Sequence, residues 1–242
     1  MKMRAVFVAT MVLALPGAAA AQIDIGWGPT VRLTPFLAIS PGFSQFAEAT
    51  IVTNNVAVGV RDMETRFNSG FGMGLNAEFR FWDALTVVGT GMWSSRGDAY
   101  FRDVRDGTTY EMDGTNFWVV KAALALQLRE IDDLRLSNGY GSVFIGPAIL
   151  TDDPKSEPTT PVAARKSSRH TALNMGAEGE IPFWNDRVAF MGAVEDYIIF
   201  WGDDATARVS GALEQVYPGS RVLVASKYSH MWNFRFGIAL RF

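Results

Sequence analysis

The chain has 242 residues, of which 48% are hydrophobic, 12% aromatic and 19% charged, with 23 glycines, no cysteine and a net charge of −3. A disordered tail would have far fewer aromatic residues, a disulfide-stabilised mini-protein would need cysteines, and a nucleic-acid-binding module would need a basic excess. We therefore expect one folded domain and no nucleic-acid partner.

Residues 1–21 have the features of a cleaved export signal. Lys2 and Arg4 precede a short apolar stretch, and a run of four alanines ends at Ala21. Cleavage after Ala21 would leave 22–242 as the mature domain. The apolar stretch is too short to span a bilayer as a helix. Export without a helical anchor leaves the periplasm, secretion or the outer membrane as destinations.

Eight segments alternate in a way that is typical of β-strands. They lie near residues 30–40, 70–81, 85–97, 114–129, 139–150, 169–181, 187–201 and 226–242. Short connections alternate with long ones, which cover 41–69, 98–113, 151–168 and 202–225. Short turns on one side and long loops on the other are the asymmetry of an outer-membrane barrel. The pattern predicts an all-β fold, an eight-stranded antiparallel up-and-down transmembrane β-barrel with long extracellular loops and short periplasmic turns.

The last predicted strand separates two kinds of side chain with a period of two. One set is large and mostly apolar: Tyr228, His230, Trp232, Phe234, Phe236, Ile238, Leu240 and Phe242. The other is small or polar: Ser229, Met231, Asn233, Arg235, Gly237, Ala239 and Arg241. In a membrane barrel the large set faces lipid, whereas in a soluble lipocalin-like barrel it would face an internal ligand. Both orientations stay open at this point, and we favour the membrane barrel.

Several local features qualify this assignment. Pro147 cannot donate a ladder hydrogen bond, which weakens the fifth strand. A change of parity at Glu195–Asp196 predicts a bulge, and Asp106–Gly107 predicts a two-residue hairpin turn. Residues 205–216 have helical spacing. Residues 41–69 could also add a further strand pair and make a barrel of ten strands.

A short motif occurs twice, about 100 residues apart in the sequence. Met73–Gly74 is followed by Phe81–Trp82, and Met175–Gly176 by Phe183–Trp184. The similarity fades within about 20 residues, which is too short for a fold built from repeats. We interpret it as convergence on the same turn chemistry.

The export signal, the alternating strands and the final segment 233–242 resemble the small outer-membrane β-barrels of the OmpA/OmpX type. In that family a terminal Phe after alternating hydrophobic residues resembles a sorting signal for the barrel-assembly machinery. The matching residues here are Phe236, Ile238, Leu240 and Phe242. The resemblance implies an outer-membrane location and this fold. We also expect a monomer with outer-membrane lipid and lipopolysaccharide as partners. Functions in the family range from structural support and adhesion to lipid modification.

Charged residues on the polar parity of the strands are expected inside the barrel. Buried charges must be paired, so we expect an ion-pair network that fills the lumen. Its expected members are Glu78, Arg80, Lys121, Arg129, Glu178, Glu180, Arg235 and Arg241. Further interior candidates are Arg32, Gln127, His170, Asn174 and Asn233. The alternative is a narrow polar conduit for small solutes.

A basic cluster lies near the outer end of the sixth strand. Arg165, Lys166 and Arg169 could contact lipopolysaccharide phosphates, because guanidinium groups pair well with phosphate. A solvated loop balanced by neighbouring acidic residues is the alternative explanation.

Catalytic patterns are not evident. Lipid A deacylases of similar architecture use a His followed two positions later by Ser, whereas His170 and His230 are followed by Ala172 and Trp232. We therefore expect no catalytic site, metal or cofactor. The predicted role is structural or in surface interaction through the extracellular loops, with a small-solute pore as the alternative and a lipid-modifying enzyme as a lower one.

Overall fold

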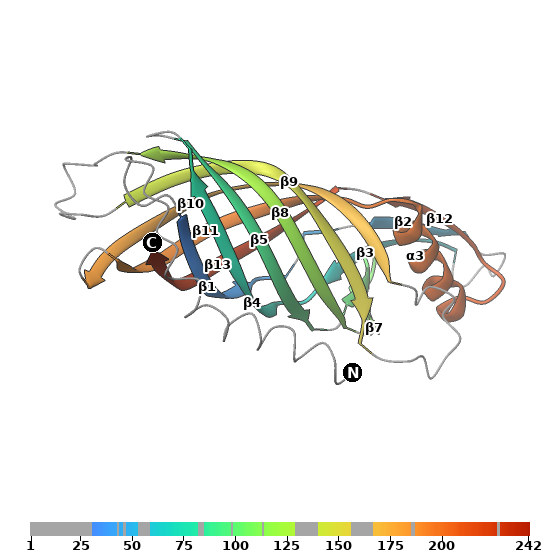
Figure 1. The fold of residues 1–242 in the computed structure, drawn as a ribbon. Helices are drawn as coiled ribbons and strands as arrows, with labels where there is room; N and C mark the ends of the chain where they lie inside the picture. The colour runs from blue at the N-terminus through green and yellow to red at the C-terminus, as the bar shows by residue number, and fades with distance from the viewer. Residues whose placement is uncertain are drawn as a thin grey trace.

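The computed structural model describes residues 31–42, 44–45, 47–52, 59–81, 85–97, 99–112, 114–128, 140–155, 167–184, 187–226 and 228–242. Eight antiparallel strands close into a barrel in the order β1-β13-β11-β10-β9-β8-β5-β4 (Figure 1). They are β1 (Val31–Ser40), β4 (Gly70–Arg80), β5 (Leu85–Arg96), β8 (Thr115–Leu128), β9 (Tyr140–Pro154), β10 (Ser168–Trp184), β11 (Val188–Phe200) and β13 (Tyr228–Arg241). The predicted eight-stranded fold is confirmed. The predicted export signal, 1–21, lies outside the described residues.

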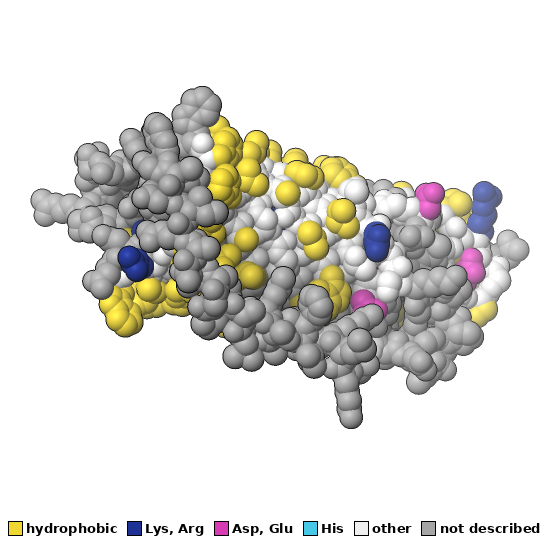
Figure 2. Space-filling model, viewed as in Figure 1, with side chains coloured by type: hydrophobic (Ala, Val, Ile, Leu, Met, Phe, Trp, Pro, Cys, Tyr) yellow, Lys and Arg dark blue, Asp and Glu magenta, His cyan; other side chains and the backbone are white. Residues whose placement is uncertain are grey.

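The barrel wall has an apolar outer surface. On β13, Phe236 is 58% exposed while Asn233 and Arg235 are buried inside. Figure 2 shows hydrophobic side chains spread over the wall, with the visible charged side chains toward the two ends. The lipocalin-like alternative is therefore wrong, because it requires the aromatic set of this strand to face inward.

Three connections at one end of the barrel fold into a second sheet, which we call the loop sheet. Its order is β12-β2-β3-β6-β7. The strands are β2 (Ala47–Val52), β3 (Val60–Phe67), β6 (Ala99–Asp103), β7 (Thr109–Met112) and β12 (Arg221–Ser226). Residues 41–69 thus contribute a hairpin to the loop sheet instead of a further strand pair in the barrel.

One helix, α3 (Asp203–Val216), packs against β12 and β2 of the loop sheet. It matches the helix expected at residues 205–216. Val209 and Leu213 are fully buried, as amphipathic spacing requires, whereas Val216 is exposed.

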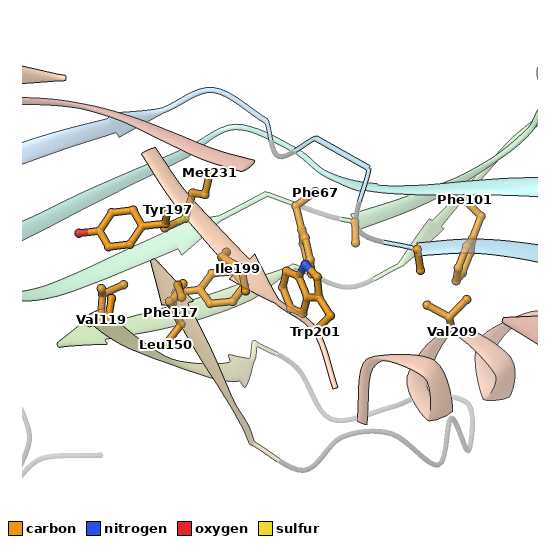
Figure 3. Packing of buried hydrophobic residues seen from close by; sticks show 14 of the residues in the cluster. Phe67, Phe101, Phe117, Val119, Leu150, Tyr197, Ile199, Trp201, Val209 and Met231 are labelled. Carbon is orange, nitrogen blue, oxygen red and sulfur yellow. The ribbon is translucent and has the colours of Figure 1, made fainter. Parts of the chain in front are cut away.

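An aromatic cluster joins the loop sheet to the barrel. Phe67 at the end of β3 packs edge-on against Phe117 of β8, with ring centroids 5.7 Å apart, and stacks on Trp201 at 6.0 Å (Figure 3). Trp201 donates a hydrogen bond of 2.6 Å from Nε1 to Ser229 Oγ. The hydrophobic core is therefore continuous from the loop-sheet end of the lumen into the loop sheet.

Three local expectations need correction. Pro147 lies within a continuous β9, because the β8–β9 pairing skips Gly146 and Pro147 and needs no donor there. β11 pairs without interruption through Glu195 and Asp196, so no bulge occurs there. The β6–β7 turn has four residues between Asp103 and Thr108, with Gly107 at φ +76°.

Candidate functional site

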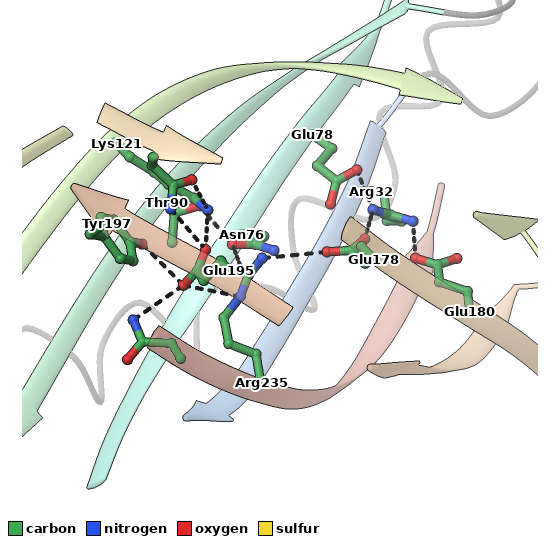
Figure 4. Close-up of polar contacts among 12 residues, drawn as sticks. Arg32, Asn76, Glu78, Thr90, Lys121, Glu178, Glu180, Glu195, Tyr197 and Arg235 are labelled. Atoms are coloured by element: carbon green, nitrogen blue, oxygen red, sulfur yellow. Dashed lines mark hydrogen bonds and ion pairs between the residues drawn. The ribbon is translucent and has the colours of Figure 1, made fainter. Parts of the chain in front are cut away.

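The centre of the candidate site is Arg32, which points from β1 into the lumen. Its guanidinium forms ion pairs with Glu78 of β4 and with Glu178 and Glu180 of β10 (Figure 4). Strand alternation brings these residues together, since each occupies an inward position on its strand. Arg241 of β13 adds a second partner for Glu180, with Nη2 2.6 Å from Oε2.

A second group of charges continues the same layer. Glu195 of β11 is fully buried and pairs with Lys121 of β8 at 2.5 Å and with Arg235 of β13 at 3.3 Å. Arg235 also lies 3.7 Å from Glu178, which links the two groups. We call the whole set the lumen charge layer: Arg32, Lys121, Arg235 and Arg241 with Glu78, Glu178, Glu180 and Glu195. The layer holds equal numbers of basic and acidic side chains.

Neutral side chains add hydrogen bonds to the layer. Asn76 Oδ1 accepts from Arg235 Nη1 at 2.9 Å and from Thr90 Oγ1 at 2.7 Å. Asn174 Oδ1 accepts from Lys121 Nζ at 3.0 Å, and the Tyr197 hydroxyl donates to Glu195 Oε1 at 3.1 Å. Such partners are what make a buried ionic cluster tolerable.

Two inward phenylalanines flank the charges. The Arg235 guanidinium carbon lies 4.9 Å from the centroid of Phe36, and Lys121 Nζ lies 4.4 Å from that of Phe144. Each ring lies over a glycine: a Cβ on Gly74 would be 2.5 Å from Phe36 Cζ, and one on Gly176 would be 2.6 Å from Phe144 Cζ. The repeated Met–Gly motif therefore has a packing reason in addition to its place before a turn.

The structure brings six of the eight expected network members together. Arg80 is half-buried at the turn end of β4 and has no ion pair with any described residue. Arg129 lies outside the described residues. Arg32, expected only as an interior residue, is central to the layer. Glu195 was missed because the bulge expected there obscured its parity, although Ala189, Met191 and Ala193 lead to it in steps of two.

The mouth of the barrel holds a buried polar pair. Ser168 Oγ and His170 Nε2 are 3.0 Å apart, and the His170 ring lies 4.6 Å from Trp201. Among the described residues, no group of three or more His, Asp or Glu side chains could hold a metal ion.

The loop sheet has its own charged cluster at the β6–β7 turn. Arg61 pairs with Asp103 at 2.8 Å and with Asp106 at 2.7 Å. Hydrogen bonds from Thr108, followed by the one from Arg61, lower the pKa of Asp106 to about 2. Close to this cluster, burial and a hydrogen bond with Tyr110 raise the pKa of Tyr217. These contacts hold the hairpin and the end of α3 in place.

The remaining expected site residues that the structure describes lie on the outside. Arg169 is exposed on β10 near the loop sheet, while Arg165 and Lys166 lie outside the described residues. Phe236 and Phe242 are exposed, and Ile238 and Leu240 are half-buried on the same outward parity.

No helix in the described part of the chain is long and apolar enough to cross a membrane.

Comparison with solved structures supports the architecture. OprG, an outer membrane protein of Pseudomonas aeruginosa, aligns with a TM-score of 0.57 over 90% of this chain and 98% of its own, at 14% identity. The fold is that of a small outer-membrane β-barrel. Neisserial surface protein A (TM-score 0.42, 10% identity, 87% and 97% coverage) and the N-terminal barrel of P. aeruginosa OprF (0.42, 9%, 89% and 99%) align less closely. No protein-family model and no curated protein matches the chain.

Proposed function

We propose that the mature chain, exported by its N-terminal signal, is a monomeric outer-membrane barrel with a closed lumen that acts at the cell surface through its loop sheet. The observation that carries the proposal is that the lumen charge layer fills the barrel and the folded loop sheet covers one of its ends. The apolar outer wall supports the membrane location, and the outward set Phe236, Ile238, Leu240 and Phe242 supports recognition by the barrel-assembly machinery.

The closed lumen follows from how the interior is filled. Eight strands leave an interior just wide enough for side chains. The lumen charge layer takes side chains from β1, β4, β8, β10, β11 and β13, so it reaches across the barrel. Toward the loop sheet, Phe67, Phe117 and Trp201 fill the mouth of the barrel (Figure 3). A solute would have to break ion pairs and then displace packed aromatic rings.

The order in the loop sheet supports the proposed surface role. Ile51, Met63, Phe101 and Leu213 are buried in it, so the connections form a packed structure instead of independent loops. Its outward positions carry charged residues of both signs, among them Asp62 and Arg102. A rigid polar surface of this kind loses little conformational entropy when it binds a partner.

Lipopolysaccharide is the lipid partner we propose for the outer end of β10. Arg169 is exposed there, and Arg165 and Lys166 precede it in the sequence. Changing all three to Gln should reduce the lipopolysaccharide that co-purifies with the protein. An unaltered amount would contradict this contact.

The experiment that tests the closed lumen is single-channel recording of the refolded mature protein in a planar bilayer. Insertion is verified separately by heat-modifiable gel mobility. We expect insertion without steady conductance. Stable, salt-dependent steps would overturn the proposal and establish the small-solute pore.

A further inference from the structure

The outward face of β11 and β13 carries an ionisable pair on an otherwise uncharged surface. Its described outward side chains include Val194, Phe200 and Phe234, all exposed hydrophobic residues. Asp196 and His230 share this face, and Asp196 pairs directly with the exposed Trp232 across the strands. Charges on the lipid side of a barrel are destabilising to a degree that depends on depth. Ionisable residues kept in such a place point to a binding role.

In this pair the Asp196 side chain is buried and the His230 side chain is exposed. His230 Nδ1 is 2.5 Å from Asp196 Oδ2. The Asp196 side chain is 7% exposed and its Oδ1 is buried without a hydrogen-bond partner among the described residues, whereas the His230 side chain is 39% exposed. Because Nδ1 faces the carboxylate, Nε2 lies on the opposite side of the ring. The site therefore presents an imidazole nitrogen and conceals its carboxylate.

Hydrogen bonds fix the backbone at His230 near the rim of the barrel. His230 donates its backbone N–H to Ser44 Oγ at 2.7 Å, and Ser44 donates its own to the His230 carbonyl at 3.1 Å. The Tyr228 ring packs edge-on against the His230 ring, with centroids 5.9 Å apart. Tyr228 and Trp232 are the outward residues before and after His230 on β13. Exposed Tyr and Trp are typical of the depth at which lipid headgroups lie.

From this geometry we infer that His230, oriented by Asp196 and flanked by Tyr228 and Trp232, binds the phosphate of an outer-leaflet lipid headgroup. In this arrangement Nδ1 faces the carboxylate and Nε2 is the ring nitrogen that meets the phosphate. A cationic ligand is disfavoured because Asp196 Oδ1 is buried and Oδ2 is already in contact with His230 Nδ1. The inference rests on the proposed membrane location, and the site is separate from the basic cluster at the end of β10.

The test is lipid binding to the refolded, full-length mature chain by native mass spectrometry, with bis-phosphorylated lipid A as the probe. The protein carries R165Q, K166Q and R169Q, so that the basic cluster does not contribute. We expect His230→Asn to weaken binding about tenfold or more, since a hydrogen bond to a charged group is lost. Asp196→Asn should also weaken binding. His170→Asn, which changes the buried histidine inside the barrel, is the matched control and should leave binding unchanged.

Three results would overturn the inference. One is equal binding by His230→Asn and its parent, and another is equal binding of lipid A from which the phosphates have been removed. The third is competition by millimolar inorganic phosphate as effective as that of the lipid, which would indicate a free-anion site. Heat-modifiable mobility is recorded for every variant, so a failure of barrel assembly is distinguished from a loss of lipid binding.

Discussion

At the scale of single residues, Arg32 determines how the lumen is organised. Its guanidinium forms ion pairs with three carboxylates. Among the described residues, Arg32 is the ion-pair partner of Glu78. Glu178 and Glu180 keep second partners in Arg235 and Arg241. Removing a single member of a buried ionic cluster is costly, because the charge left behind is neither hydrated nor paired.

Arg32→Gln should therefore lower the free energy of unfolding by about 3–5 kcal/mol. The measurement is urea unfolding of the protein refolded into lipid vesicles. Arg80→Gln is the control, because Arg80 has no ion pair with a described residue, and its effect should stay within about 0.5 kcal/mol. Equal losses in the two variants would show that the lumen charge layer does not stabilise the barrel.

The turn between β6 and β7 gives a second prediction at this scale. The pKa of Asp106 is lowered from 3.8 to about 2, so its ionised form stabilises the turn above pH 3.8 and this contribution disappears as pH falls through about 2. Titration of the Asp106 carboxyl carbon by NMR should give a midpoint near 2. Arg61→Gln should move the midpoint upward, and an unchanged midpoint would exclude the contribution of the Arg61 contact.

At the scale of strands, close packing inside the barrel depends on glycines, two of which lie beneath phenylalanine rings. Gly74 pairs with Phe36 and Gly176 with Phe144, and each glycine lies beneath the phenylalanine of the neighbouring strand. A side chain at either position would collide with a ring and also with backbone, since a Cβ on Gly176 would be 2.4 Å from the Val194 carbonyl oxygen.

Gly176→Ala should destabilise the barrel by about 1–3 kcal/mol, the usual cost of overpacking. The matched control is Gly192→Ala on β11, where an added Cβ meets no atom within 4 Å. Both are measured by the same unfolding assay. A neutral Gly176→Ala would mean that the strands separate easily at this point.

At the scale of the whole molecule, the barrel and the loop sheet place opposite kinds of surface in different environments. The barrel turns apolar side chains outward, whereas the loop sheet buries them under α3 and against the loop-sheet end of the lumen. The connections that form this sheet leave the same end of the barrel, and the short turns lie at the other end. This polarity predicts which end of the molecule faces the cell exterior.

An epitope tag inserted after Gly107 should be accessible to antibody on intact cells, because it lies at the tip of the β6–β7 hairpin. A tag inserted between Trp184 and Arg187, in a short turn, should become accessible only after the outer membrane is permeabilised. Accessibility of the second tag alone would reverse the proposed orientation.

Alternation along the strands was enough to predict the barrel. The large set of β13 and the mixed polar set of β10 show a period of two that follows directly from strand geometry, so strand positions and the residues that share a face could be predicted without tertiary information. The same logic brought Glu78, Lys121, Glu178, Glu180, Arg235 and Arg241 into the lumen. It failed at Glu195, because inward Tyr197 and Ile199 are apolar and looked like a change of face.

Local sequence therefore determined the eight strands and which residues share a face with the charges, since each depends on neighbours along the chain. Tertiary structure alone decided which charges pair, that three separate connections join in the loop sheet, and that Asp196 meets His230 on the outer wall. These outcomes depend on the register between strands and on contacts between segments far apart in sequence. A period of two carries no information about either.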